Sequence, residues 1–92
     1  MDFYLISYDI PDDRRRTKVA DLLQDYGQRV QFSVFEVWLD DRMRDDLLAR
    51  LQKAIAPDED SVRLYRLCAA CHKKVITLGL GAVSQPPTTI II

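Results

Sequence analysis

Two segments with helical periodicity, each lying between strand-like apolar runs, constrain the fold of this chain most strongly. Residues 3–8 are rich in aromatic and apolar side chains and are expected to form a strand. Apolar residues then recur at the i, i+3, i+4, i+7 spacing that marks one face of a helix. They are Val19, Leu22, Leu23 and Tyr26. Asp12 or Asp13 supplies the N-cap, and Gly27 ends the helix.

A second succession of strand and helix patterns follows. Residues 29–39 form an extended apolar run that is too long for one strand, so we expect two strands joined by a tight turn near Ser33. Asp40-Asp41 caps a second helix, which stops before Pro57. The apolar stripe of this helix is Met43, Leu47, Leu48, Leu51 and Ile55.

Two more strands complete the pattern, one at residues 61–67 and one at residues 75–78. The order β-α-β-β-α-β, with an extra strand near the carboxyl terminus, predicts an α+β ferredoxin-like sheet with both helices on one face. With 92 residues and a hydrophobic fraction of 48%, the chain has room for one folded domain, expected over residues 1–80.

Two features predict a homodimer. A sheet with helices on one face normally alternates apolar and polar residues, yet residues 34–39 are apolar on both faces apart from Glu36. A second copy of the chain is expected to cover the open face. In the tail, residues 81–92, a Pro-Pro pair precedes a strand-like segment that is expected to pair with the partner's sheet. The alternatives are that this segment folds back on its own sheet or frays.

Composition and charge limit the setting. No apolar run approaches the ~20 residues that span a bilayer, and the amino terminus lacks the basic and apolar regions of a signal peptide. We therefore expect a cytoplasmic protein that has no membrane partner and keeps both cysteines reduced. Net charge is −1, so any nucleic-acid surface must be local, and the densest basic segment is residues 14–18.

Asp9 is a candidate ligand for Mg²⁺. It ends the first strand, and Pro11 breaks the chain shortly after it. One carboxylate is a poor site, but two copies that face each other near a dimer axis would double it, and water and substrate phosphate would complete the coordination. The alternative is that Asp9 only caps the turn before Pro11, a common use of Asp.

Three arginines open the first helix, where the macrodipole disfavours cations. At 3.6 residues per turn, Arg14 and Lys18 fall on an outward face that is expected to be solvated and partly ion-paired. Arg15 and Arg16 flank the apolar stripe and are expected to lean toward the sheet and Asp9. They either extend over the rim of the core or hold a phosphate beside the metal, and Arg16 is the better candidate for the phosphate.

Three further side chains are weaker candidates. Tyr8 and Phe35 are core or interface residues by default. Beside a metal, Tyr8 would hydrogen-bond a substrate and Phe35 would stack on a base. Ser33 would orient a ligand, although turn formation explains this residue equally well.

The segment from Cys68 to His72 matches the C-x-x-C-H pattern of c-type haem attachment, and it offers three of the four ligands of a zinc site. Haem attachment normally needs export, for which no signal is present, and no fourth zinc ligand lies nearby. We therefore expect no haem, and a pair of small, half-buried thiols in a loop or at a strand end. His72, the single histidine, is expected on the surface.

Together these motifs resemble one family, the CRISPR-associated protein 2 family, which is the small subunit of CRISPR spacer acquisition. The likeness spans residues 3 to about 80 with the right order and spacing. The segments that carry it are Tyr8–Ile10, Arg14–Val19, Tyr26-Gly27, Arg29–Glu36, Asp60–Arg63 and Tyr65–Cys68.

The resemblance implies a ferredoxin-like homodimer whose carboxyl-terminal strands are added to the partner's sheet. The family's metal-ligating aspartate falls on Asp9 at the dimer interface, where the two copies would share one Mg²⁺. A second position of the first helix, often arginine in the family, is Lys18 here, so charge is kept but bidentate phosphate binding is lost. Residues linked to nuclease activity in the family fall on Tyr8, Arg16, Arg29, Ser33 and Phe35.

The leading functional hypothesis is a Mg²⁺-dependent endonuclease that hydrolyses single-stranded RNA or double-stranded DNA. One alternative is a non-catalytic adaptor that binds DNA and bridges dimers of the integrase subunit, CRISPR-associated protein 1. A second alternative is a toxin-like ribonuclease acting on messenger RNA. The residues expected to contact nucleic acid are Arg14, Arg15, Arg16, Lys18 and Arg29.

Overall fold

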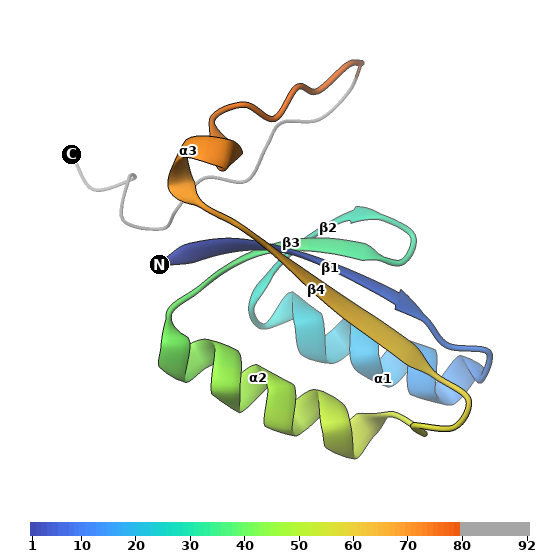
Figure 1. Ribbon diagram of the computed structural model, residues 1–92. Coiled ribbons are helices and arrows are strands. Elements are labelled where there is room, and N and C mark those ends of the chain that lie inside the picture. Colours follow the sequence, from blue (N-terminus) through green and yellow to red (C-terminus); the bar gives the residue numbers. More distant parts are fainter. Residues whose placement is uncertain (80–92) are drawn as a thin grey trace.

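The computed structural model describes residues 1–79, so the predicted tail and its partner-pairing strand lie outside the described residues. A four-stranded antiparallel sheet has the order β2-β3-β1-β4, and α1 and α2 lie side by side on one face of it (Figure 1). The ferredoxin-like prediction is confirmed. The elements are β1 (Asp2–Asp9), α1 (Asp13–Gln24), β2 (Gly27–Gln31), β3 (Val34–Leu39), α2 (Asp41–Ala54), β4 (Ser61–Leu67) and α3 (Ala69–His72).

Aspartate caps define where both long helices begin. The side chain of Asp12 accepts a hydrogen bond from the backbone N–H of Arg15, and that of Asp40 accepts one from Met43. Each satisfies one of the N–H groups that the first helical turn leaves without a partner. Of the two candidate caps, Asp12 is therefore the N-cap. Neither α1 nor α2 is long and apolar enough to cross a membrane, and the same holds for α3.

The core lies between the sheet and the two helices. Alternate residues of β1 and β3 point to this side, as the period of two along a strand requires. Tyr4, Ile6 and Tyr8 of β1 are all buried there. The facing residues are Phe35, Val37 and Leu39 of β3, Val19 and Leu23 of α1, and Leu47 and Leu51 of α2.

On the opposite, open face, α3 covers one end of the sheet. His72 packs against the rings of Phe3 and Trp38, with centroid separations of 4.7 and 4.8 Å. The prediction that His72 lies on the surface is wrong, because its imidazole is buried against these two aromatic rings. The prediction of half-buried thiols is also wrong, since both are exposed: Cys68 is the N-cap of α3 and Cys71 lies within it.

The strand predicted at residues 75–78 does not form. Ile76 and Leu78 are 84% and 88% exposed. Their composition favours a strand, but a strand also needs a partner edge, and α3 turns the chain away from β4. The segment instead borders a groove of about 680 Å³ whose other wall includes Leu5 and Val34 of the open face. Whether a second copy covers this face, and hence the homodimer, stays a prediction.

One ion pair joins the two halves of the fold. The side chain of Asp60 is fully buried and accepts from Nε of Arg15 at 2.7 Å and from the backbone N–H of Ala56 at 2.8 Å. Glu59 binds the same guanidinium at 2.9 Å. The first turn of α1 is therefore tied to the loop that leads into β4. The Arg15 guanidinium, helped by the Ala56 N–H, holds the pKa of Asp60 below its usual range.

We predict that Asp60→Asn destabilises the fold in a pH-dependent way. A carboxylate whose pKa is lowered in the folded state adds stability above its unfolded pKa, about 3.9, and that stability is lost as pH falls through the folded pKa. Urea unfolding at neutral pH should therefore give a clearly lower free energy of unfolding for the variant than for wild type. This difference in free energy should narrow below about pH 4. Asp58→Asn, an exposed change in the same loop, is the control. Equal loss at all pH values would contradict the role of the charge.

Candidate nucleic-acid interface

Three elements meet at the end of β1. Its last residue, Asp9, pairs with Ser61, which is the first residue of β4, and α1 begins only four residues later at Asp13. Asp9 is exposed, and its carboxylate has no hydrogen bond or ion pair to any residue in the described part of the chain. Asp12 is the residue that caps the helix after this turn. The alternative role of Asp9 as a turn cap is therefore not seen, and its oxygens stay available to a ligand.

The chemistry of Asp9 fits one half of a Mg²⁺ site. An exposed carboxylate is a hard oxygen ligand of the kind that Mg²⁺ prefers, with water or phosphate filling the other positions. Within residues 1–79 no three His, Cys, Asp or Glu side chains are grouped closely enough to hold a metal. Alternation along β1 puts Asp9 on the open face with Leu5 and Ser7. A second carboxylate would have to come from a molecule that covers this face.

Tyr8, Arg16 and Arg29 line one cavity of about 300 Å³, together with Phe32 and the outer side of α1. The hydroxyl of Tyr8 donates to the carbonyl of Phe32 at 3.3 Å, and Nη2 of Arg29 donates to the Tyr8 oxygen at 3.5 Å. Three residues of the predicted site are therefore brought together. Asp9 does not line this cavity, because Tyr8 and its neighbour point to opposite faces of the strand.

Arg16 is held at the turn that follows β1. Its Nη1 donates to the carbonyl of Ile10 at 2.9 Å, and its Nη2 pairs with Asp13. Its side chain remains 31% exposed, so the guanidinium has a fixed position and still faces the cavity. This geometry suits a phosphate ligand, since a pre-positioned guanidinium loses little freedom when it binds.

The two phenylalanines near the β2–β3 turn lie in different environments. Phe35 is fully buried beneath the guanidinium of Arg29, whose Cζ lies 5.4 Å from the ring centroid. Phe35 is therefore a core residue, as expected by default, and its buried ring cannot serve the alternative role of stacking on a base. Phe32 is 75% exposed at the tip of the turn, and it borders the cavity. Its position next to Ser33, where a turn was predicted, was the signal for exposure.

Ser33 contributes through its main chain. Its carbonyl accepts a hydrogen bond from the backbone N–H of Tyr8 at 3.1 Å, which ties the β2–β3 turn to the end of β1. The turn-forming explanation of this residue is therefore the one that the geometry supports.

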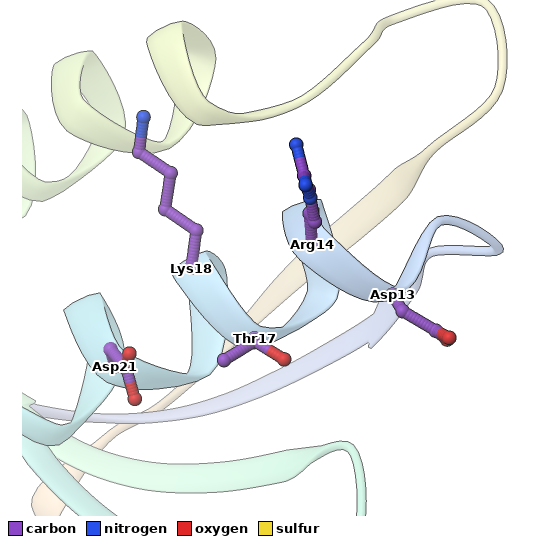
Figure 2. Close-up of a pocket in the computed structure, with 5 residues that line it drawn as sticks. All are labelled: Asp13, Arg14, Thr17, Lys18 and Asp21. Atoms are coloured by element: carbon purple, nitrogen blue, oxygen red, sulfur yellow. The ribbon is translucent and has the colours of Figure 1, made fainter.

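The basic run splits by function. Arg15 leans toward the sheet as expected, but Asp60 and Glu59 bind its guanidinium, so it is not directed at Asp9. Arg14 and Lys18 are exposed, and no carboxylate of the described residues pairs with either. They extend to the same side from successive turns of α1 and border a shallow depression of about 440 Å³ (Figure 2). The exposure predicted for this pair is confirmed, but the expected ion pairing is not seen for either residue within residues 1–79.

Comparison with known proteins identifies the family. A family model described as CRISPR associated protein Cas2 matches residues 1–75. The chain is 47% identical over 92 residues to a Synechocystis sp. protein named CRISPR-associated endoribonuclease Cas2 3, and the match covers 100% of both chains.

Solved structures agree with this assignment. Streptococcus pyogenes Cas2 at pH 6.5 has a TM-score of 0.74 and 38% identity, with 84% of this chain and 99% of that chain covered. A chain in a partial Cas6-RT-Cas1–Cas2 complex has a TM-score of 0.73 and 34% identity, with 85% and 91% covered. The protein therefore belongs to the CRISPR-associated Cas2 family.

Proposed function

We propose that this chain is a metal-dependent endonuclease that works with the CRISPR integrase subunit, Cas1, in spacer acquisition. The observation that carries the proposal is the uncommitted carboxylate of Asp9 at the end of β1, one residue from the cavity that Tyr8, Arg16 and Arg29 line. Relatives that are named endoribonucleases, and the similarity to a chain in a complex with Cas1, support this activity and this partner. The substrate class is single-stranded RNA or double-stranded DNA.

The proposed active form is a homodimer in which the two Asp9 carboxylates hold one Mg²⁺ between the open faces. When bound, the ion would supply Lewis-acid polarisation of the scissile phosphate and a more acidic water. The chain itself positions the substrate. Arg16 and Arg29 would neutralise a phosphate of the strand that lies in their cavity. The hydroxyl of Tyr8, which accepts from Arg29, would donate to that phosphate in place of the Phe32 carbonyl.

The proposed path of the nucleic acid follows from the exposed side chains of Arg14, Lys18 and Phe32. Arg14 and Lys18 would contact successive phosphates along α1, since their side chains extend in the same direction (Figure 2). Phe32, which borders the separate cavity of Tyr8, Arg16 and Arg29, offers an exposed ring on which a base could stack. Together these groups give a strand-binding surface that does not depend on the weakly acidic net charge.

A specific observation also favours the adaptor function. Within residues 1–79 no group of three or more acidic, His or Cys side chains forms at the proposed metal site, whereas Arg14, Lys18 and Phe32 are exposed and can bind nucleic acid without any metal. An adaptor that holds DNA beside Cas1 would need only these groups. The two functions share an interface and differ in whether Asp9 is required.

Asp9→Asn separates the two functions. If the chain is a nuclease, the variant should lose Mg²⁺-dependent cleavage of labelled RNA and duplex DNA by on the order of 100-fold or more, because a neutral amide is a much weaker ligand. Asp58→Asn, another exposed aspartate, should cleave at the wild-type rate. Undiminished cleavage by purified Asp9→Asn protein would rule out the nuclease proposal. Spacer integration with Cas1 that survives in the same variant would support the adaptor.

Removing the free cations of α1 should weaken binding in a salt-dependent way. For Arg14→Ala with Lys18→Ala, the slope of log K against log salt on duplex DNA should fall by about 0.9 for each phosphate that the variant no longer neutralises. Arg42→Ala removes one exposed arginine of α2 and should leave the slope unchanged. Fluorescence anisotropy titrations at several salt concentrations measure this, and an unaltered slope in the double variant would place the nucleic acid elsewhere.

Phe32→Ala should cost about 1–3 kcal/mol of binding free energy on single-stranded RNA, which is the range for one base stacked on an aromatic ring. Phe32→Tyr keeps the ring and should bind as wild type does, whereas Phe32→Leu keeps an apolar side chain and should resemble the alanine variant. Equal affinity of the tyrosine and leucine variants would show that a ring is not needed at this position.

A further inference from the structure

A pair of exposed thiols lies outside the proposed nucleic-acid site. The sulfur atoms of Cys68 and Cys71 are 3.2 Å apart, on either side of the first turn of α3. The backbone N–H of Cys71 also donates to the sulfur of Cys68 at 3.3 Å. Neither thiol is bonded elsewhere, and both face solvent. A disulfide needs about 2.05 Å between its sulfurs, so closing this pair requires a shift of little more than 1 Å.

The two thiols are chemically unequal. The contact with the Cys71 thiol, together with the backbone N–H of Cys71, lowers the pKa of Cys68, while the contact with the Cys68 thiol raises the pKa of Cys71. Because the thiolate is the attacking species, Cys68 is the more reactive member and Cys71 keeps its proton until it is needed. This division between an attacking and a resolving thiol is what a dithiol exchange site requires.

We propose that Cys68 and Cys71 form a reversible dithiol–disulfide site that exchanges with a low-molecular-weight disulfide such as glutathione disulfide. Cys68 thiolate attacks one sulfur of glutathione disulfide, forming a mixed disulfide and releasing one glutathione thiolate. Cys71 then loses its proton to solvent and attacks the Cys68 sulfur, which releases the second glutathione. In total two S–H groups become one S–S bond, and two electrons and two protons reduce one glutathione disulfide to two glutathiones.

The redox state of the two thiols would affect how firmly α3 covers one end of the open sheet face. His72 follows Cys71 directly and packs on Phe3 and Trp38, so the conformation of α3 decides whether that end of the sheet is covered. A helix of four residues has little stability of its own and depends on these contacts. A bond between Cys68 and Cys71 would restrict the first turn of α3 and hold His72 in place. In the reduced form, α3 would move away from Phe3 and Trp38 more often.

Thiol trapping tests the exchange chemistry on the full chain. Wild-type protein is equilibrated with mixtures of reduced and oxidised glutathione, alkylated, and analysed by mass spectrometry. Both thiols should disappear together, as an intramolecular bond without retained glutathione. Cys71→Ser should retain glutathione on Cys68, and Cys68→Ser should react more slowly. Glutathione retained at equilibrium by wild-type protein, or equal rates for the two single variants, would overturn the proposal.

Trp38 reports the effect on the cover, because it is the only tryptophan. Quenching of its fluorescence by acrylamide should be weaker in the oxidised protein, where α3 is held over the ring, than in the reduced protein. The double variant Cys68→Ser with Cys71→Ser should show no difference between the two conditions, and its circular dichroism should match wild type because both positions are exposed. Identical quenching of oxidised and reduced wild-type protein would overturn the link to α3.

Discussion

The ion pair between Arg15 and Asp60 is the constraint on which the functional end of this molecule depends. It joins the first turn of α1 to the residue before β4, and β4 pairs with the end of β1 that carries Asp9. Asp60 is buried, so its negative charge needs a partner. Arg15 supplies the positive charge, and its guanidinium is therefore not available to bind an external ligand. The neighbouring Arg14 and Lys18 have no carboxylate partner among residues 1–79 and could bind an external anion. One arginine of the basic run thus secures the fold, whereas Arg14 and Lys18 could act on a ligand.

Alternation along β1 divides the proposed site between two faces. Tyr8 points to the helix-covered side and joins Arg16 and Arg29 in a cavity formed by one chain. Asp9 points to the open side, where residues 1–79 form no group of three or more side chains that could hold a metal. In the proposed site, one chain would hold a phosphate, and metal chemistry would need a second carboxylate. This division would allow the same fold to serve either as the proposed adaptor or as the proposed nuclease.

Most of the fold could be predicted from periodicity, since the core positions of α1, α2 and β1 recur at fixed spacings. The predictions are wrong where tertiary contacts, and not local periodicity, determine the position of a residue. His72 and residues 75–78 depend on where α3 turns, which no local pattern encodes. The turn between β2 and β3 exposes the ring of Phe32, whereas the ring of Phe35, at the start of β3, is buried. Asp60 was missed as a structural partner, because only the folded chain brings it to Arg15 across 45 positions of sequence.

One cover of the open face is α3, and the proposed second copy would be another at the opposite end. The cluster of Phe3, Trp38 and His72 closes the end where β1 begins, using the chain's own α3. At the other end Asp9 is exposed, and the alternation of β1 brings it to this same face. A second copy that approaches the Asp9 end would not have to displace α3. The proposed metal site and the proposed thiol site can therefore operate on one sheet face, and the redox state of Cys68 and Cys71 would change the width of the surface left to the partner.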